Sequence, residues 1–90
     1  MRINELLPLL PDLAALVAVS EAGSFSAAAR AQGSTPSAVS RQVARLEAAL
    51  GLKVFERSTR RLRLTAGGQE VLRHARSMLD AAHAACDGAA

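Results

Sequence analysis

The stretch SFSAAARAQGSTPSAVSRQVARLEAALG, residues 24–51, decides the fold of this 90-residue chain. It predicts a short helix over residues 26–32 and a longer helix over residues 36–50. Residues 33–35 form the turn between the two helices, and this turn contains glycine. A short helix, a glycine-containing turn of three or four residues and a longer helix together make a helix-turn-helix.

Residues that favour helix ends flank both helices. Serine and threonine cap helix N-termini, proline fits the first helical turn, and glycine accepts the left-handed conformation that ends a helix. Here they are Ser24, Gly33, Thr35, Pro36 and Gly51. The longer helix also carries apolar residues at spacings of four, three and four, which place them on one face: Val39, Val43, Leu46 and Leu50.

Upstream of this stretch, Asp12 is expected to cap a further helix that Gly23 ends. Residues 1–10 show no clear period and are predicted to be an N-terminal leader. The longest apolar run, residues 13–20, falls well short of the ~20 residues that a membrane span needs. Acidic and proline residues also interrupt the apolar core that a secretion signal requires. We therefore expect no membrane partner.

Downstream, apolar and basic residues alternate with a period of two, which predicts a two-stranded ribbon over residues 52–64 with a basic tip at residues 57–61. Thr65 is expected to cap a last helix over residues 66–86, and Gly68 near its start is expected to permit close packing. Apolar residues on this helix recur in a pattern that permits a short coiled-coil seam. The residues predicted to form a dimer contact are Leu72, Ala75, Met78, Leu79 and Ala82.

Charge is distributed unevenly along the chain. The net charge is +3, yet ten of the eleven basic residues lie between positions 30 and 76, where only three of the eight acids lie. A basic middle between acidic ends is typical of a surface that binds a polyanion. The face of the 36–50 helix opposite its apolar stripe suits entry into a DNA major groove, because small side chains permit close approach and one arginine can reach a base edge. That face carries Ser37, Ser40, Arg41, Ala44 and Ala48.

Five stretches in order resemble the N-terminal domain of the LysR-type transcriptional regulators: residues 23–29 (GSFSAAA), 35–43 (TPSAVSRQV), 46–51 (LEAALG), 54–57 (VFER) and 64–68 (LTAGG). The resemblance covers residues 13–87. It implies a mainly α winged helix-turn-helix, with three helices and a two-stranded β-wing, followed by a long helix through which such domains dimerise. The corresponding parts are a leader (1–10), a DNA-binding domain (11–65) and a linker or dimerisation helix (66–90).

The resemblance also implies roles for individual residues. Ser37, Ser40 and Arg41 match positions that contact bases or nearby phosphates, and Pro36 stands where many members have a glutamine. Ser24 and Thr35 match positions that bind phosphate. Arg57, just before the hairpin turn, matches the wing position that reaches the minor groove. The full set of predicted DNA contacts is Ser24, Thr35, Pro36, Ser37, Ser40, Arg41, Arg45, Arg57, Arg60, Arg61 and Arg63.

The predicted function is a sequence-specific DNA-binding domain of a transcriptional regulator that reads an inverted repeat of double-stranded DNA as a homodimer. A winged-helix module for protein interaction or oligomerisation remains the alternative. The sequence holds no catalytic set of residues and no phosphate loop after a strand, so no enzyme and no cofactor are expected. His74 and His83 lack a third ligand, so no metal is expected. The single cysteine, Cys86, favours a reduced, cytoplasmic setting. The family's C-terminal effector domain lies outside this chain, so no small-molecule effector is expected on it.

Overall fold

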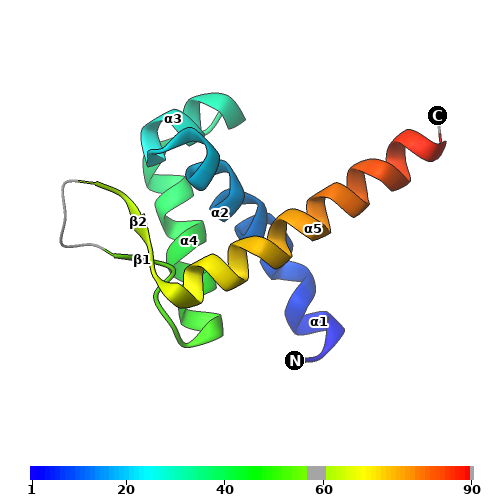
Figure 1. Cartoon of the computed structure of the whole chain (residues 1–90), viewed down its shortest axis with the longest axis horizontal. Coiled ribbons are helices and arrows are strands. Elements are labelled where there is room, and N and C mark those ends of the chain that lie inside the picture. Colours follow the sequence, from blue (N-terminus) through cyan, green and yellow to red (C-terminus); the bar gives the residue numbers. More distant parts are fainter. Residues whose placement is uncertain (57–60, 90) are drawn as a thin grey trace.

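The computed structural model describes residues 1–56 and 61–89, without the side chain of residue 89. Figure 1 shows α2, α3 and α4 packed together, the two strands at one side, and α5 crossing the domain and extending away from it. This confirms the mainly α winged helix-turn-helix with a long last helix. The elements are α1 (Ile3–Leu6), the 3₁₀ helix η1 (Leu7–Leu9), α2 (Leu10–Ala22), α3 (Phe25–Gln32), α4 (Pro36–Leu50), β1 (Phe55–Glu56), β2 (Arg63–Leu64) and α5 (Ala66–Ala89).

The ends of α3 and α4 form as the sequence predicts. The Ser24 hydroxyl accepts a hydrogen bond from the Ala27 N–H at 3.0 Å, and the Thr35 hydroxyl accepts one from the Ala38 N–H at 3.1 Å. Gly33 ends α3 with φ of 64°, a left-handed conformation that costs glycine little. Gly33 at the end of α3 and Thr35 at the start of α4 thus bound the short turn between the two helices.

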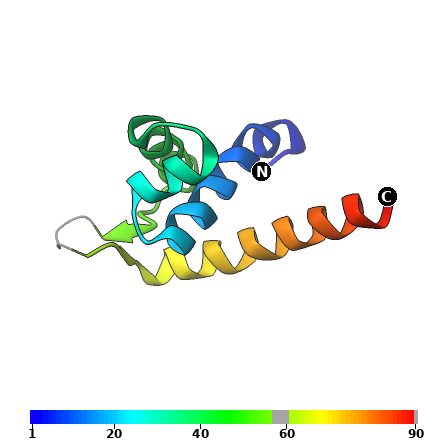
Figure 2. The same cartoon turned by 90° about the horizontal axis from the view of Figure 1, so that it is seen from above.

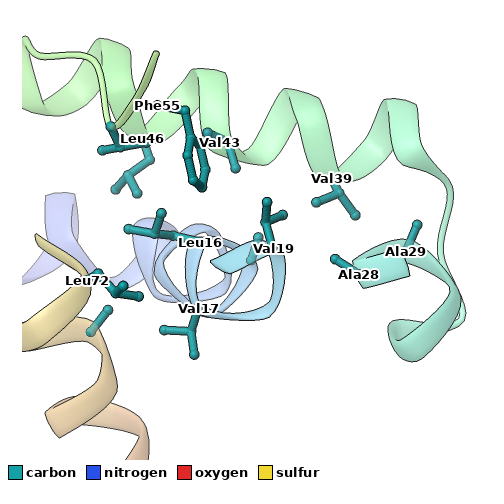
Figure 3. Close-up of a cluster of buried hydrophobic side chains, with 13 residues drawn as sticks. Leu16, Val17, Val19, Ala28, Ala29, Val39, Val43, Leu46, Phe55 and Leu72 are labelled. Carbon is teal, nitrogen blue, oxygen red and sulfur yellow. The ribbon is translucent and has the colours of Figure 1, made fainter. Parts of the chain in front are cut away.

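The core lies where the apolar stripe of α4 meets α2 (Figure 3). Val39, Val43 and Leu46 are fully buried, and Leu16 of α2 is buried with them. Leu50, the fourth member of the predicted stripe, is half-buried at the end of the helix. Because α4 gives its apolar side to α2 and α3, its opposite side faces outward.

The ribbon forms an antiparallel pair in which Phe55 lies opposite Leu64 and Glu56 lies opposite Arg63. The predicted ribbon is therefore confirmed, although residues 57–60 of its tip lie outside the described part. The Phe55 ring packs edge-on against Phe25 of α3, with ring centroids 5.9 Å apart. Such aromatic contacts are directional, so the pair fixes the ribbon to the start of α3.

The last helix divides into a packed half and a projecting half (Figure 2). Leu72 and Ala75 are buried in the core of the chain itself, so they are not available to a partner, which corrects the prediction that they form a dimer contact. Their side of α5 is covered by α2, a contact that the spacing within α5 could not reveal. Met78 and Leu79 are half-buried, and Ala82 is exposed.

The N-terminal residues differ from the sequence prediction. The helix capped by Asp12 was expected to begin there, but α2 begins at Leu10 and Leu9 holds the N-cap position. Asp12 is instead a fully buried residue inside the helix. Residues 3–9 are helical despite their lack of a clear period, and Leu9 is buried.

Helices α1, η1 and α2 join into one run, Ile3–Ala22, that is long and apolar enough by length and composition to cross a membrane. The sequence did not indicate this, because the longest apolar run taken alone is much shorter. Core helices of soluble proteins and signal sequences pass the same test. In the structure, α2 contributes Ala15, Leu16, Val17 and Val19 to the hydrophobic core.

The start of α5 packs tightly on the segment before β1, as expected for Gly68. A Cβ atom on Gly68 would lie 2.1 Å from the carbonyl oxygen of Val54. That oxygen is held in place because it accepts a hydrogen bond from the Thr65 N–H at 3.0 Å. Thr65 also caps α5, since its hydroxyl accepts from the Gly68 N–H at 2.9 Å and donates to the Lys53 carbonyl at 2.6 Å.

We therefore expect Gly68→Ala to lower the free energy of unfolding by about 1–3 kcal/mol, the usual cost of overpacking. Urea denaturation measures this change. Gly67→Ala is the matched control, because its Cβ would only touch the Leu52 side chain at 3.4 Å. The control should be neutral or stabilising by about 0.5–1 kcal/mol, the helical advantage of alanine. Equal stability of the two variants would contradict the packing argument.

Candidate nucleic-acid interface

The outward side of α4 carries the face that the sequence predicted to enter a major groove. Ser37, Arg41, Ala44 and Ala48 are exposed, and Ser40 is half-buried. We call these five residues the reading face. Residues three and four apart lie on one side of a helix, so they form a continuous strip of short side chains with a single long cationic one. The structure therefore brings together the predicted residues of this helix on an accessible surface.

Two helix N-termini carry predicted phosphate contacts, and that of α4 lies at the beginning of the reading face. Ser24 and Thr35 are both exposed at the starts of α3 and α4, and each hydroxyl is used as a cap. Pro36 is exposed in the first turn of α4. Helix N-termini attract phosphate because unpaired N–H groups and the helix dipole point at it. Capping and phosphate contact are compatible at these positions.

The basic ribbon supplies a second cationic surface. Arg61 and Arg63 are exposed. Arg57 and Arg60, also predicted as DNA contacts, lie outside the described residues. Arg63 stands opposite Glu56 across the ribbon, on the strand that leads into α5.

Arg45 of α4 has a partner that the sequence did not suggest. Its Nε donates to Asp12 Oδ2 at 2.8 Å, and its Nη2 donates to Asp12 Oδ1 at 2.7 Å. The Asp12 side chain is fully buried, whereas that of Arg45 is 59% exposed. The hydrogen bonds to Asp12, together with the negative charge of Asp12, raise the pKa of Arg45 above its ordinary value. The pair ties α4 to α2 through two hydrogen bonds.

This ion pair cannot be opened cheaply. The Asp12 carboxylate is fully buried, so it would be left without a partner if the Arg45 guanidinium moved away, and an uncompensated buried charge is unfavourable. The DNA contact predicted for Arg45 stays a prediction, but any such contact has to leave Asp12 in place. The sequence signal for this ion pair was Asp12, an acid next to an apolar helical stretch. Because Asp12 was interpreted as a helix cap, its pairing with Arg45 was not predicted.

Glu47 holds the other side of α4. Its side chain is almost fully buried, and its Oε2 accepts a hydrogen bond from the Val54 N–H at 2.9 Å. Its Oε1 lies 3.8 Å from Lys53 Nζ. Sequence reasoning missed this role, although the position next to Leu46 in the helical period places Glu47 beside the buried stripe. Glu47 and Arg45 thus attach α4 to two different neighbouring segments.

Other charged groups gather on α5. Glu70 forms an ion pair with Arg73, whose hydrogen bond and positive charge lower the pKa of the Glu70 carboxyl. His74 lies 3.7 Å from the same carboxylate. All three side chains are exposed. Across the part of the chain that the structure describes, no three His, Cys, Asp or Glu side chains gather in a way that could hold a metal ion.

Comparison with known proteins identifies this arrangement. The family model for bacterial regulatory helix-turn-helix proteins of the lysR family matches residues 10–69. The chain belongs to the LysR family. The match covers the helix-turn-helix, the ribbon and the start of α5, so it includes the reading face. Residues 1–9 lie outside it.

Relatives of this LysR-family domain are transcriptional regulators. The chain is 54% identical over 83 residues to a protein named as a probable regulator, LtrA of Klebsiella pneumoniae, and this covers 92% of the chain but 27% of LtrA. A probable hydrogen peroxide-inducible genes activator of Mycobacterium avium is 48% identical over 77 residues, 86% of the chain and 25% of the relative. The chain therefore spans about a quarter of the length of these relatives, in keeping with a DNA-binding domain of a LysR-type regulator.

Solved structures of similar domains include complexes with DNA. The CbnR DNA-binding domain, solved with DNA, has a TM-score of 0.79 and 38% identity, covering 89% of this chain and 92% of that one. The BenM DNA-binding domain, solved on catB site 1 DNA, has a TM-score of 0.82 and 31% identity, covering 87% and 84% respectively. The winged helix-turn-helix of this chain is thus the fold of domains that bind DNA.

Glu47→Ala tests how far α4 depends on its polar attachment. The substitution leaves the Val54 N–H buried without its acceptor, which typically costs about 1–3 kcal/mol. We expect a loss of that size in the free energy of unfolding, measured by urea denaturation. Glu21→Ala replaces an exposed acid of α2 and should stay within about 0.5 kcal/mol of the parent. A Glu47→Ala variant as stable as Glu21→Ala would contradict the anchoring role.

Proposed function

We propose that this domain binds duplex DNA with α4 lying in the major groove and its reading face against the base edges. The observation that carries the proposal is the exposed strip of small side chains around Arg41 on the second helix of a helix-turn-helix. Short side chains let the helix backbone come close to the bases, and arginine pairs with the O6 and N7 atoms of guanine. Similar domains solved as complexes with DNA support DNA as the partner.

Phosphate contacts set the register of the helix in the groove. Ser24 and Thr35, at the starts of α3 and α4, are the proposed contacts on one side of the reading face. Pro36 and Ser37 in the first turn of α4 complete this end. The ribbon is the proposed contact on the other side, where it follows the backbone or the minor groove through Arg57, Arg60, Arg61 and Arg63.

The domain acts as a dimer through the projecting half of α5. Met78, Leu79 and Ala82 are the proposed contact residues, since Leu72 and Ala75 are occupied by the core. Met78 also lines an apolar groove of about 230 Å³ between α5 and the N-terminal helices, which leaves hydrophobic surface beside this contact. Two domains related by a two-fold axis would read an inverted repeat with half-sites about one helical turn, or a multiple, apart. The protein would act in the cytoplasm of a bacterium, where the chromosome lies.

A salt series on a duplex of arbitrary sequence separates this function from the alternative of a protein-interaction or oligomerisation module. Log affinity should fall linearly with log salt, because each neutralised phosphate releases counterions and contributes about 0.9 to the slope. The folded domain failing to bind duplex DNA at low salt would exclude the proposed function. It would leave the interaction or oligomerisation module as the better explanation.

Arg41→Ala should lose about 1–3 kcal/mol of binding free energy on a selected site and much less on unrelated DNA. The loss reflects a base contact, so preference at one position of the site should relax. Arg63→Ala is the comparison, since a phosphate contact weakens binding on all sequences and lowers the salt slope by about 1. Titration of each variant on both duplexes measures this. Equal losses on both duplexes for Arg41→Ala would make Arg41 a phosphate contact instead.

Ala82→Glu should weaken dimerisation at least about ten-fold, which corresponds to about 1.4 kcal/mol. The expected cause is a carboxylate placed in the apolar contact, where it lacks a partner. Ala84→Glu is the control, because residue 84 is also exposed but lies on another side of α5. Sedimentation equilibrium measures both dimer constants. If the two variants dimerise equally well, the contact does not involve Ala82.

A further inference from the structure

The two residues of the Asp12–Arg45 ion pair differ in their exposure to solvent. The Asp12 side chain is fully buried in α2, and the Arg45 side chain, though bonded to it, is 59% exposed. The guanidinium carries five N–H groups. Asp12 accepts one from Nε and one from Nη2. The remaining donors are on Nη1 and Nη2, on the edge of the guanidinium that Asp12 does not occupy.

Arg45 stands beside the reading face. It follows Arg41 by four residues on α4, and residues at this spacing are neighbours on a helix surface. Where the reading face lies against bases, a residue at its border lies near the phosphates that line the groove. The exposed part of the Arg45 side chain therefore belongs to a residue at the border of the reading face, within the region where a phosphate of bound DNA would lie.

Arg45 cannot reach such a phosphate by leaving Asp12. The buried carboxylate would then have no partner, which costs more than a single charge-assisted hydrogen bond returns. A planar guanidinium, however, can accept a second anion on its free edge while the first stays bound. Because folding has already fixed the long side chain, DNA binding would not have to pay the entropy of ordering it.

We infer that Asp12 is a positioning residue for DNA binding: it holds Arg45 so that the free edge of the guanidinium binds a backbone phosphate next to the reading face. The inference rests on the proposed function. It adds that a buried acid, which itself contacts no DNA, contributes to DNA binding. It also has a counterintuitive consequence, because removing this negative charge should weaken binding to a polyanion.

Asp12→Asn and Glu21→Gln make the decisive pair. Both acids are on α2, and each change raises the net charge from +3 to +4, but Glu21 is exposed and far along the helix from the ion pair. Simple electrostatics predicts tighter DNA binding for both. We expect Glu21→Gln to bind a generic duplex as tightly as the parent or more tightly. Asp12→Asn should bind about three- to ten-fold more weakly, with a salt slope reduced by up to about 1.

Arg45→Lys keeps the charge and gives Asp12 a partner, but an ammonium group has no second planar edge. It therefore tests the same inference if Asp12→Asn does not fold, and it should show a similar loss and the same reduced slope. Val43→Ala shows what lower stability alone does, because it opens the core without touching the pair and should leave the salt slope unchanged. Circular dichroism confirms that each variant is folded under the binding conditions.

Binding by Asp12→Asn as tight as that of Glu21→Gln, or by Arg45→Lys as tight as that of the parent, would overturn the inference. Tighter binding by Asp12→Asn would mean that Asp12 withholds Arg45 from DNA. The parent domain serves as the reference for the function itself. If the parent shows no salt-dependent binding, the proposed function fails, whereas a steep slope in the parent with no effect of Asp12 removes only the positioning role.

Discussion

The burial of one stripe of α4 against α2 is the constraint on which the rest of this domain depends. Val39, Val43 and Leu46 are fully buried with Leu16. Because a helix has a fixed period, burying this stripe turns the opposite side of α4 outward. The short side chains around Arg41 are therefore exposed as a direct result of this burial. Core packing and presentation of the reading face are two consequences of the same helical geometry.

Apolar packing is not directional. It therefore defines the rotation and the axial position of α4 less precisely than directional hydrogen bonds do. Two buried acids supply that definition. Asp12 takes Arg45 of α4 in a bidentate pair, and Glu47 of α4 takes the backbone N–H of Val54 at the entry to the ribbon. One joins α4 to α2 and the other joins it to the wing. The helix proposed to lie in a DNA groove is thus attached by directional contacts on two sides.

Local signals predicted most of the fold correctly. The caps by Ser24 and Thr35, the glycine that ends α3 and the alternation in the ribbon all depend on residues close together in sequence. The errors have a common origin in contacts between distant residues. Asp12 was predicted to be a helix cap because its partner, Arg45, is 33 residues away in the sequence. Residues of α5 were predicted to form a coiled-coil seam because the sequence does not show that α2 covers them.

Residues close together in sequence were enough to predict the helix-turn-helix, the ribbon, the outward side of α4 and the resemblance to LysR-type regulators. These follow from periodicity, capping and short motifs, which act over a few residues. The tertiary structure alone decided that Arg45 is bound by a buried acid, that Glu47 anchors the ribbon, and that Leu72 and Ala75 belong to the core. Each of these depends on which surfaces meet when the chain folds. One amphipathic helix offers the same pattern to its own domain as to a partner, so its sequence does not determine which of them it contacts.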